Sequence, residues 1–197
     1  MQPRGDTWSG VYHIVIRGNN KRAVFIRGCD YSYFKKLLKR YKKKYKFLLY
    51  HYVLMKNHVH LCIDAAQNVN ISKVMQSLQI SYNHYRKRRR GYVGHLWQGR
   101  FKSYLIDTEQ YMLRADIYIE KNPVEAGLVK DPLEYSWSSY KHYAIGEIDP
   151  LVDTNPSYGN MGKTPKEQQK NYRQLMQVLI EESANNKKCN VPCCNSK

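Results

Sequence analysis

The sequence predicts an α+β sandwich, an antiparallel sheet with helices packed on one face. Short runs at residues 11–17 and 58–63 alternate their side chains between two faces, as strands do. The stretches 34–41 and 71–85 carry apolar side chains three and four residues apart, as helices do. The polar pair Lys56-Asn57 separates two apolar runs and indicates a hairpin. With 197 residues, the chain is long enough for one sizeable core.

The first predicted elements are a strand and a helix. In the strand one face is formed by Tyr12, Ile14 and Ile16 and the other by His13, Val15 and Arg17. Turn residues at Gly18-Asn19-Asn20 end this strand. Asp30 can cap a helix that runs to about Lys44. The buried stripe expected for this helix is Phe34, Leu37, Leu38 and Tyr41.

The middle of the chain predicts a hairpin and a second helix. Residues 47–55 are nearly all apolar and rich in aromatic rings, which is typical of a central strand. Lys56-Asn57 then turns the chain into a second strand, which begins at His58. Apolar side chains from Ile71 to Tyr85 mark a helix that an arginine run and Gly91 end.

The next elements complete the order βαββαβα with antiparallel neighbours, which is typical of a ferredoxin-like sandwich. Residues 94–106 are punctuated by glycine and are expected to contain another strand. Asp107 or Thr108 can cap a third helix, and Pro123 must end it near Asn122.

A C-terminal extension follows this sandwich. Thr164-Pro165-Lys166-Glu167 forms a capping box with proline at the first helical position, which predicts a last helix through about Ser183. We therefore divide the chain into one domain of residues 1–145 and an extension of residues 146–197. The extension is expected to hold one helix and a disordered tail.

The pair His58-Val59-His60 is the strongest sign of chemistry. On a strand the two imidazoles project from one face, while Val59, Leu61 and Ile63 point into the core. Two imidazoles side by side form half of a site for a divalent metal ion. The alternative is that they are ordinary polar residues on the wet face of a strand.

The positive charge indicates a nucleic-acid partner. The formal net charge is +17, and between Tyr31 and Ile106 there are 17 Lys and Arg residues and a single acid, Asp64. Such one-signed density attracts polyanions and makes binding strongly salt-dependent. Eighteen tyrosines supply rings on which unpaired bases can stack. A solvated helix face explains Lys42 to Lys44, but not two basic clusters that flank one histidine pair.

Other classes of protein are disfavoured by the sequence. The N-terminal residues lack the apolar stretch of a signal peptide, and neither a membrane-spanning run nor a basic amphipathic helix with a broad aliphatic face is found. A cytoplasmic protein without a membrane partner is therefore expected. Five cysteines without a secretory signal indicate reduced thiols. Cys189, Cys193 and Cys194 lack a second pair at zinc-ligand spacing, so a frayed tail is expected there instead of a zinc site.

One face of the third predicted helix carries polar side chains that suit such a metal site. Arg114, Tyr118 and Asn122 are spaced four residues apart and so share this face. A site for phosphodiester chemistry needs a third ligand and a nucleophile near the histidines. The alternative is again ordinary, with Tyr118 half-buried and Asn122 capping the helix before a proline.

Four ordered blocks, continued by Trp137-Ser-Ser-Tyr140, carry a family resemblance. The blocks are Tyr12-His-Ile-Val-Ile-Arg-Gly-Asn19, Leu54-Met-Lys-Asn-His-Val-His60, Gly94-His-Leu-Trp-Gln-Gly-Arg-Phe-Lys102 and Tyr118-Ile-Glu-Lys-Asn-Pro-Val-Glu-Ala-Gly-Leu-Val129. Together they resemble the single-tyrosine HUH transposases, in particular the group associated with repetitive extragenic palindromes (REP) in bacteria. The resemblance spans about Val11 to Tyr143. It departs at Lys56, where the family often has proline.

The resemblance implies a metal-dependent endonuclease and strand transferase for single-stranded DNA, with the HUH motif on its antiparallel sheet. Tyr118 matches the nucleophile that forms a 5′-phosphotyrosine, and Asn122 matches the third metal ligand beside His58 and His60. Tyr111 is the second choice of nucleophile because it lacks the Asn-Pro context. The expected ion is Mg²⁺ or Mn²⁺, and the mixed nitrogen and oxygen ligands suit Mn²⁺ at least as well.

Single-stranded or hairpin DNA is the implied partner. We expect its binding surface to include Arg17, Asn19, Arg86, Lys87, Arg88, Arg89, Arg90, Arg100 and Lys102. A monomer is favoured by the long extension, and a homodimer that supplies the tyrosine helix in trans is the alternative. Two other functions stay open: a non-catalytic single-stranded nucleic-acid binder on the same fold, and a domesticated or replication-initiator nuclease with the same site.

Overall fold

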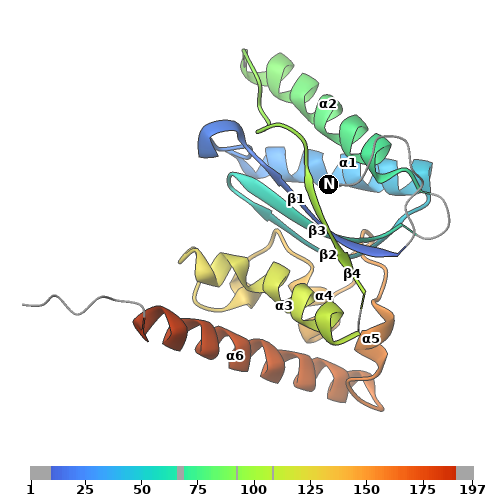
Figure 1. The fold of residues 1–197 in the computed structure, drawn as a ribbon, viewed down its shortest axis with the longest axis vertical. Coiled ribbons are helices and arrows are strands. Elements are labelled where there is room, and N and C mark those ends of the chain that lie inside the picture. The colour runs from blue at the N-terminus through green and yellow to red at the C-terminus, as the bar shows by residue number, and fades with distance from the viewer. Residues whose placement is uncertain (1–9, 66–68, 92, 108, 190–197) are drawn as a thin grey trace, which may run out of the picture.

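A four-stranded antiparallel sheet in the order β2-β3-β1-β4 forms the centre of the protein (Figure 1). The computed structural model describes residues 10–65, 69–91, 93–107 and 109–189, with only the backbone for residues 109–111 and 186–189. The strands are β1 (Val11–Arg17), β2 (Leu48–Met55), β3 (His58–Asp64) and β4 (Lys102–Ile106). The order of strands and helices is the ferredoxin-like one, so the predicted fold class is confirmed.

Helices α1 (Gly28–Tyr45) and α2 (Ile71–Arg90) cover one face of the sheet, as predicted. The main core lies between them and the sheet. Its helical side chains recur three and four residues apart, as do the predicted Phe34, Leu37, Leu38 and Tyr41. The α1 helix begins two residues before Asp30, whose Oδ2 accepts hydrogen bonds from the backbone N–H groups of Ile26 and Arg27 at 2.9 and 3.0 Å.

The opposite face of the sheet is also covered, which corrects the expectation of helices on one face only. Helix α3 (Glu109–Glu125) packs Ala115 and Ile119 against Tyr50, Val53 and Met55 of β2. The physical reason is visible in β2, whose residues after Leu48 are all buried. A strand that is apolar on both faces needs cover on both faces.

The C-terminal extension packs against α3. It contains the short helix α5 (Pro156–Gly159) and the long helix α6 (Pro165–Cys189), after α4 (Tyr140–Ile145). Two short 3₁₀ turns, η1 (Asn19–Lys21) and η2 (Pro132–Glu134), lie elsewhere in the chain. Ile117 of α3, Tyr143 of α4 and Tyr172 of α6 belong to one hydrophobic cluster. The extension thus shares a hydrophobic cluster with α3 and α4. Helix α6 runs past the predicted end at Ser183.

Two further sequence expectations concern ends and membranes. Helix α3 continues through Pro123 to Glu125, so the proline does not end it at Asn122 as predicted. Thr108, Cys193 and Cys194 lie outside the described residues. In the part of the chain that the structure describes, no helix is long and apolar enough to cross a membrane.

Candidate active site

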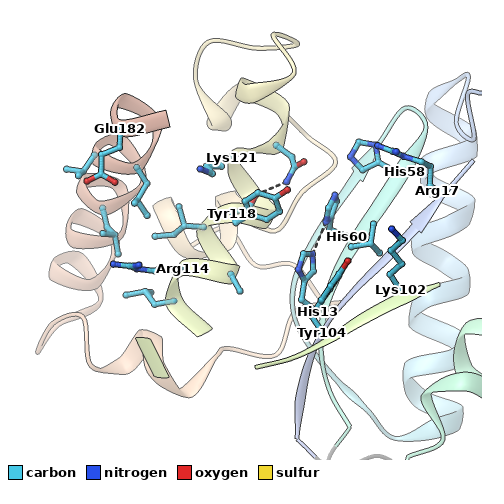
Figure 2. Close-up of a pocket in the computed structure, with 18 of the residues that line it drawn as sticks. His13, Arg17, His58, His60, Lys102, Tyr104, Arg114, Tyr118, Lys121 and Glu182 are labelled. Carbon is cyan, nitrogen blue, oxygen red and sulfur yellow. Dashed lines mark hydrogen bonds between the residues drawn. The ribbon is translucent and has the colours of Figure 1, made fainter. Parts of the chain in front are cut away.

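A cleft of about 1360 Å³ opens between the histidine-bearing face of the sheet and helices α3 and α6. Antiparallel pairing sets Arg17 opposite His58 and Val15 opposite His60, and paired residues point to the same face. Figure 2 shows Tyr118 on α3 facing His60 and His13 on the sheet. The structure thus brings together, in one cleft, the predicted residues Arg17, His58, His60, Arg100, Lys102, Tyr118 and Asn122.

The two HUH histidines are each held through the Nδ1 atom of the ring. The Nδ1 atom of His58 lies 2.7 Å from Oδ1 of Asn57, and Nδ1 of His60 lies 2.8 Å from Nε2 of His13. The ring centroids of His58 and His60 are 5.0 Å apart. With both Nδ1 atoms engaged, the Nε2 atoms are the ones available to a metal ion.

The protonation of these rings suits metal binding. Burial, then the neighbouring rings of His13 and His58, lowers the pKa of His60 to about 2. Burial also lowers the pKa of His13 to about 4, against a weaker opposing effect of Asp116, and lowers the pKa of His58. All three imidazoles are therefore neutral at pH 7, which is the form that binds metal ions.

Asn122 is oriented by its own helix. Its Nδ2 atom donates to the backbone carbonyls of Tyr118 at 2.6 Å and Ile119 at 3.2 Å. Pro123 has no N–H with which to bond the Ile119 carbonyl four residues earlier, so this carbonyl is left to the amide of Asn122. The Asn122 side chain also contacts the His58 ring, and this contact opposes the larger effect of burial, which lowers the pKa of His58. The Asn122 side chain thus lies beside His58 in the cleft.

Together these contacts make a donor set that fits a divalent ion, namely two neutral imidazoles and one amide oxygen. Within the described residues, no group of three His, Cys, Asp or Glu side chains could hold a metal ion. Asn122 lines the same cleft, so its amide oxygen could supply a third protein ligand. Such a sparse set leaves coordination positions for phosphate oxygens.

Tyr118 lies at the mouth of the site. Its side chain is 44% exposed, and its ring centroid is 6.0 Å from those of His13 and His60. The Nζ atom of Lys121 lies 5.7 Å from the centre of the Tyr118 ring and is held by Glu125 at 2.9 Å and Ser183 at 2.7 Å. Burial and the Glu125 charge raise the pKa of Tyr118, so its hydroxyl is protonated at neutral pH. Tyr111 also belongs to α3, but its side chain lies outside the described part.

The predicted DNA-binding residues fall into two groups. Arg17, Arg100 and Lys102 line the cleft, together with Arg114 and Lys121, which the sequence did not single out for binding. The arginine run at the end of α2 lies on the opposite face of the sheet. Asn19 is in η1, where its backbone N–H donates to the Leu96 carbonyl at 2.9 Å.

Arg86 is a correction to the predicted DNA surface. Its side chain is buried, and its Nη1 atom lies 3.5 Å from the buried carboxylate of Asp30, which also contacts Arg90 at 3.3 Å. Arg86 therefore neutralises an internal charge and is not available to a phosphate. Arg88 and Arg89 are exposed and line a smaller hollow with Arg40, Tyr33 and Tyr85.

His13 is the residue at the site that sequence reasoning missed. The alternation of β1 puts it on the same face as Arg17, but its contact with His60 depends on the pairing of β1 with β3. That pairing brings together residues 47 positions apart in the chain, which local periodicity does not register. The only sequence signal was the chemistry of a third histidine on a predicted strand.

Comparisons with known proteins identify a family and similar solved structures. A family model described as "Transposase IS200 like" matches residues 6–122. Among solved structures, a REP-associated tyrosine transposase bound to a REP hairpin is 17% identical, with a TM-score of 0.65 over 80% of this chain and 93% of that chain. A protein assigned as a transposase in Deinococcus radiodurans is 16% identical, with a TM-score of 0.43 over 61% and 96%. No curated protein matches the sequence.

The family match covers more than half of the 197 residues. This chain belongs to the IS200-like transposase family and is a DNA-processing enzyme of the transposase class. The structural likeness, at its low identity, supports the fold alone.

Proposed function

We propose that the protein nicks and rejoins single-stranded DNA, with Tyr118 as nucleophile and a Mg²⁺ or Mn²⁺ ion held by His58, His60 and Asn122. One observation carries the proposal. Tyr118 and Asn122 occupy one face of α3, and they line one cleft with two histidines whose Nδ1 atoms are already engaged. The contact of the Asn122 side chain with His58, and its fixed Nδ2 atom, support its role as third ligand.

The covalent step is a transesterification. The Tyr118 hydroxyl oxygen bonds to the scissile phosphorus and loses its proton to solvent, while the bond from phosphorus to O3′ breaks and O3′ takes up a proton. The products are a 5′-phosphotyrosine and a free 3′ hydroxyl. Attack by another 3′ hydroxyl reverses the step and joins the strand, so the energy of the original bond is retained without ATP.

The metal ion, when bound, would stabilise the charge that develops on the phosphate oxygens. The chain itself supplies the rest of the site. His58, His60 and Asn122 are fixed by hydrogen bonds, so little ordering is needed when substrate binds. Cationic side chains at the cleft, Arg17 and Lys102 among them, would hold the flanking phosphates of the strand.

Two finer points complete the proposal. The hairpin bound by the REP-associated neighbour makes a DNA hairpin with a single-stranded flank the substrate of choice for testing. We also infer a monomer as the active form, because Tyr118 and both histidines line one cleft of a single chain. A homodimer with exchanged α3 helices would need to break the cluster that Ile117 forms with Tyr143 and Tyr172.

The test is a covalent trap with labelled single-stranded DNA and Mn²⁺. Wild-type protein should give a slow-migrating protein–DNA adduct on a denaturing gel. Phe at position 118 keeps the ring and removes only the hydroxyl, so Tyr118→Phe should bind DNA normally and give neither cleavage nor adduct. Tyr111→Phe is the matched control and should keep the adduct. Binding without cleavage by the wild-type protein would instead favour the non-catalytic alternative.

A further inference from the structure

The contact between His13 and His60 offers more than packing. Both rings are buried, and they lie edge to edge with 5.1 Å between their centroids and 23° between their planes. Nε2 of His13 is 2.8 Å from Nδ1 of His60, a normal hydrogen-bond distance. The two strands that carry them, β1 and β3, are the central strands of the sheet and hold this geometry firmly.

A hydrogen bond between two neutral imidazoles contains one proton, which can belong to either ring. If Nδ1 of His60 carries it, Nε2 of His60 presents a lone pair to the cleft. If Nε2 of His13 carries it, His60 must hold its own proton on Nε2, where it blocks a metal ion. The direction of this one bond therefore decides whether His60 can act as a ligand.

His58 shows how the neighbouring ligand is set. Nδ2 of Asn57 donates to the carbonyl of Lys21 at 3.2 Å, so its Oδ1 atom faces Nδ1 of His58. An amide oxygen can only accept, so His58 must carry its proton on Nδ1. At His60 the residue that faces Nδ1 is not an amide but His13.

We propose that His13 is a positioning residue that accepts the Nδ1–H of His60 and thereby fixes the His60 tautomer and ring for metal binding. The inference rests on the proposed metal site and adds a residue on β1 to it. His13 would not contact the metal or the DNA itself. Its role matches that of Asn57 toward His58, so each histidine of the HUH pair has its own acceptor.

The first test measures Mn²⁺ affinity of the full chain by calorimetry or electron paramagnetic resonance. His13→Leu removes the acceptor and should weaken Mn²⁺ binding about 10- to 100-fold, the range found when an outer partner of a metal ligand is removed. His13→Gln retains an oxygen acceptor near the position of Nε2 and should keep an affinity close to that of wild type. His84→Leu, on the exposed surface of α2, controls for the loss of a histidine.

The second test needs no metal. Long-range ¹H–¹⁵N spectra of histidine rings report which nitrogen carries the proton, and His60 should hold it on Nδ1 in the wild type and in His13→Gln. In His13→Leu the proton should redistribute toward Nε2. A wild-type spectrum with His60 protonated on Nε2 overturns the inference, as does unchanged Mn²⁺ affinity in His13→Leu. Absence of Mn²⁺ binding by wild type would refute the metal site itself, and the spectra would still decide the role of His13.

Discussion

At the scale of single residues, Pro123 explains how the Asn122 side chain is oriented. A proline in a helix leaves the carbonyl four residues earlier without its usual partner, and here that carbonyl, of Ile119, is taken by the Asn122 side chain. With Nδ2 held at two carbonyls, the amide cannot rotate freely, and the side chain stays in contact with His58. The Asn-Pro pair thus restricts the orientation of the Asn122 side chain.

Replacing Pro123 by Ala tests whether this restricted orientation matters for metal binding. Alanine restores an N–H that can bond the Ile119 carbonyl, so Asn122 loses one of its two acceptors. We expect Mn²⁺ affinity to fall by up to about tenfold, while the helix is retained or slightly stabilised. Calorimetric titration with Mn²⁺ and thermal unfolding measure the two effects. Pro156→Ala, at the start of the separate helix α5, is the control, and an equal loss in both variants would contradict the explanation.

The histidines and Asn122 should differ in their importance. His58→Ala and His60→Ala should each abolish cleavage and largely spare DNA binding, because neutral imidazoles add little to the electrostatic attraction of DNA. Asn122→Ala should be milder, since water can replace an amide oxygen as a ligand. Gel-based cleavage and binding assays on the same labelled strand separate the effects. Cleavage by the His variants in excess Mg²⁺ would show that the metal site is wrongly assigned.

At the scale of elements, helix α3 is fixed in place by a buried polar network on the side away from Tyr118. His51 of β2 lies 2.9 Å from Glu120 and 3.3 Å from Asp116, both on α3. Tyr172 of α6 donates to Glu120 at 2.7 Å, and Asn155 donates to Asp116 at 2.6 Å. The extension thereby helps to position the helix that carries the proposed nucleophile.

Because of this network, we expect the free energy of unfolding to decrease at alkaline pH. Burial alone would lower the pKa of His51, but Asp116 and Glu120 raise it to about 9. A folded pKa above the unfolded value of about 6.5 means that the stabilisation is complete below pH 6.5 and is lost as pH rises toward 9. The loss should reach about 3 kcal/mol in the free energy of unfolding, measured by urea titrations from about pH 6 to 9.5.

Glu120→Gln provides the control for this pH dependence. It removes one of the two carboxylates that raise the pKa of His51 and keeps the side-chain shape, so the alkaline loss of stability should shrink. The same alkaline loss in Glu120→Gln and wild type would mean that His51 is not the group that titrates.

The sequence predicted the features of each element that depend on local residue patterns, and it missed those that depend on the pairing of distant strands. The alternation of side chains along a strand placed His58 and His60 on one face of β3. The spacing of four residues placed Tyr118 and Asn122 on one face of α3. The His13–His60 contact required the register between β1 and β3. The unbroken apolar run of β2 is typical of a strand that is buried on both faces. We did not predict from it that α3 covers the second face of the sheet.

At the scale of the whole molecule, positive charge is divided between two faces of the sheet. One set of cations lines the active-site cleft, and another lies along α1 and α2 on the far side. Composition predicted the total positive charge but not which of the charged side chains are buried. The spacing in α2 did contain a signal for Arg86, since it follows the buried Tyr82 and Leu78 at intervals of four residues and so continues the apolar stripe.

The exposed and buried arginines of α2 should therefore behave oppositely. Arg88 and Arg89 are exposed, so replacing both by Ala should weaken DNA binding and flatten the plot of log K against log salt, by roughly 0.7 for each phosphate of a single strand that the variant no longer neutralises. Arg86→Ala leaves the buried Asp30 carboxylate with less compensation, so it should destabilise the fold by about 3–5 kcal/mol.

Binding of folded Arg86→Ala protein should keep the wild-type salt slope, because Arg86 reaches no phosphate. Fluorescence anisotropy from about 50 to 300 mM salt, with urea titrations of each variant, measures both quantities. A reduced slope in Arg86→Ala, or an unchanged slope in the Arg88 and Arg89 double variant, would mean that the charges which meet DNA lie elsewhere. The cleft cations Arg17 and Lys102 would then be the next to replace.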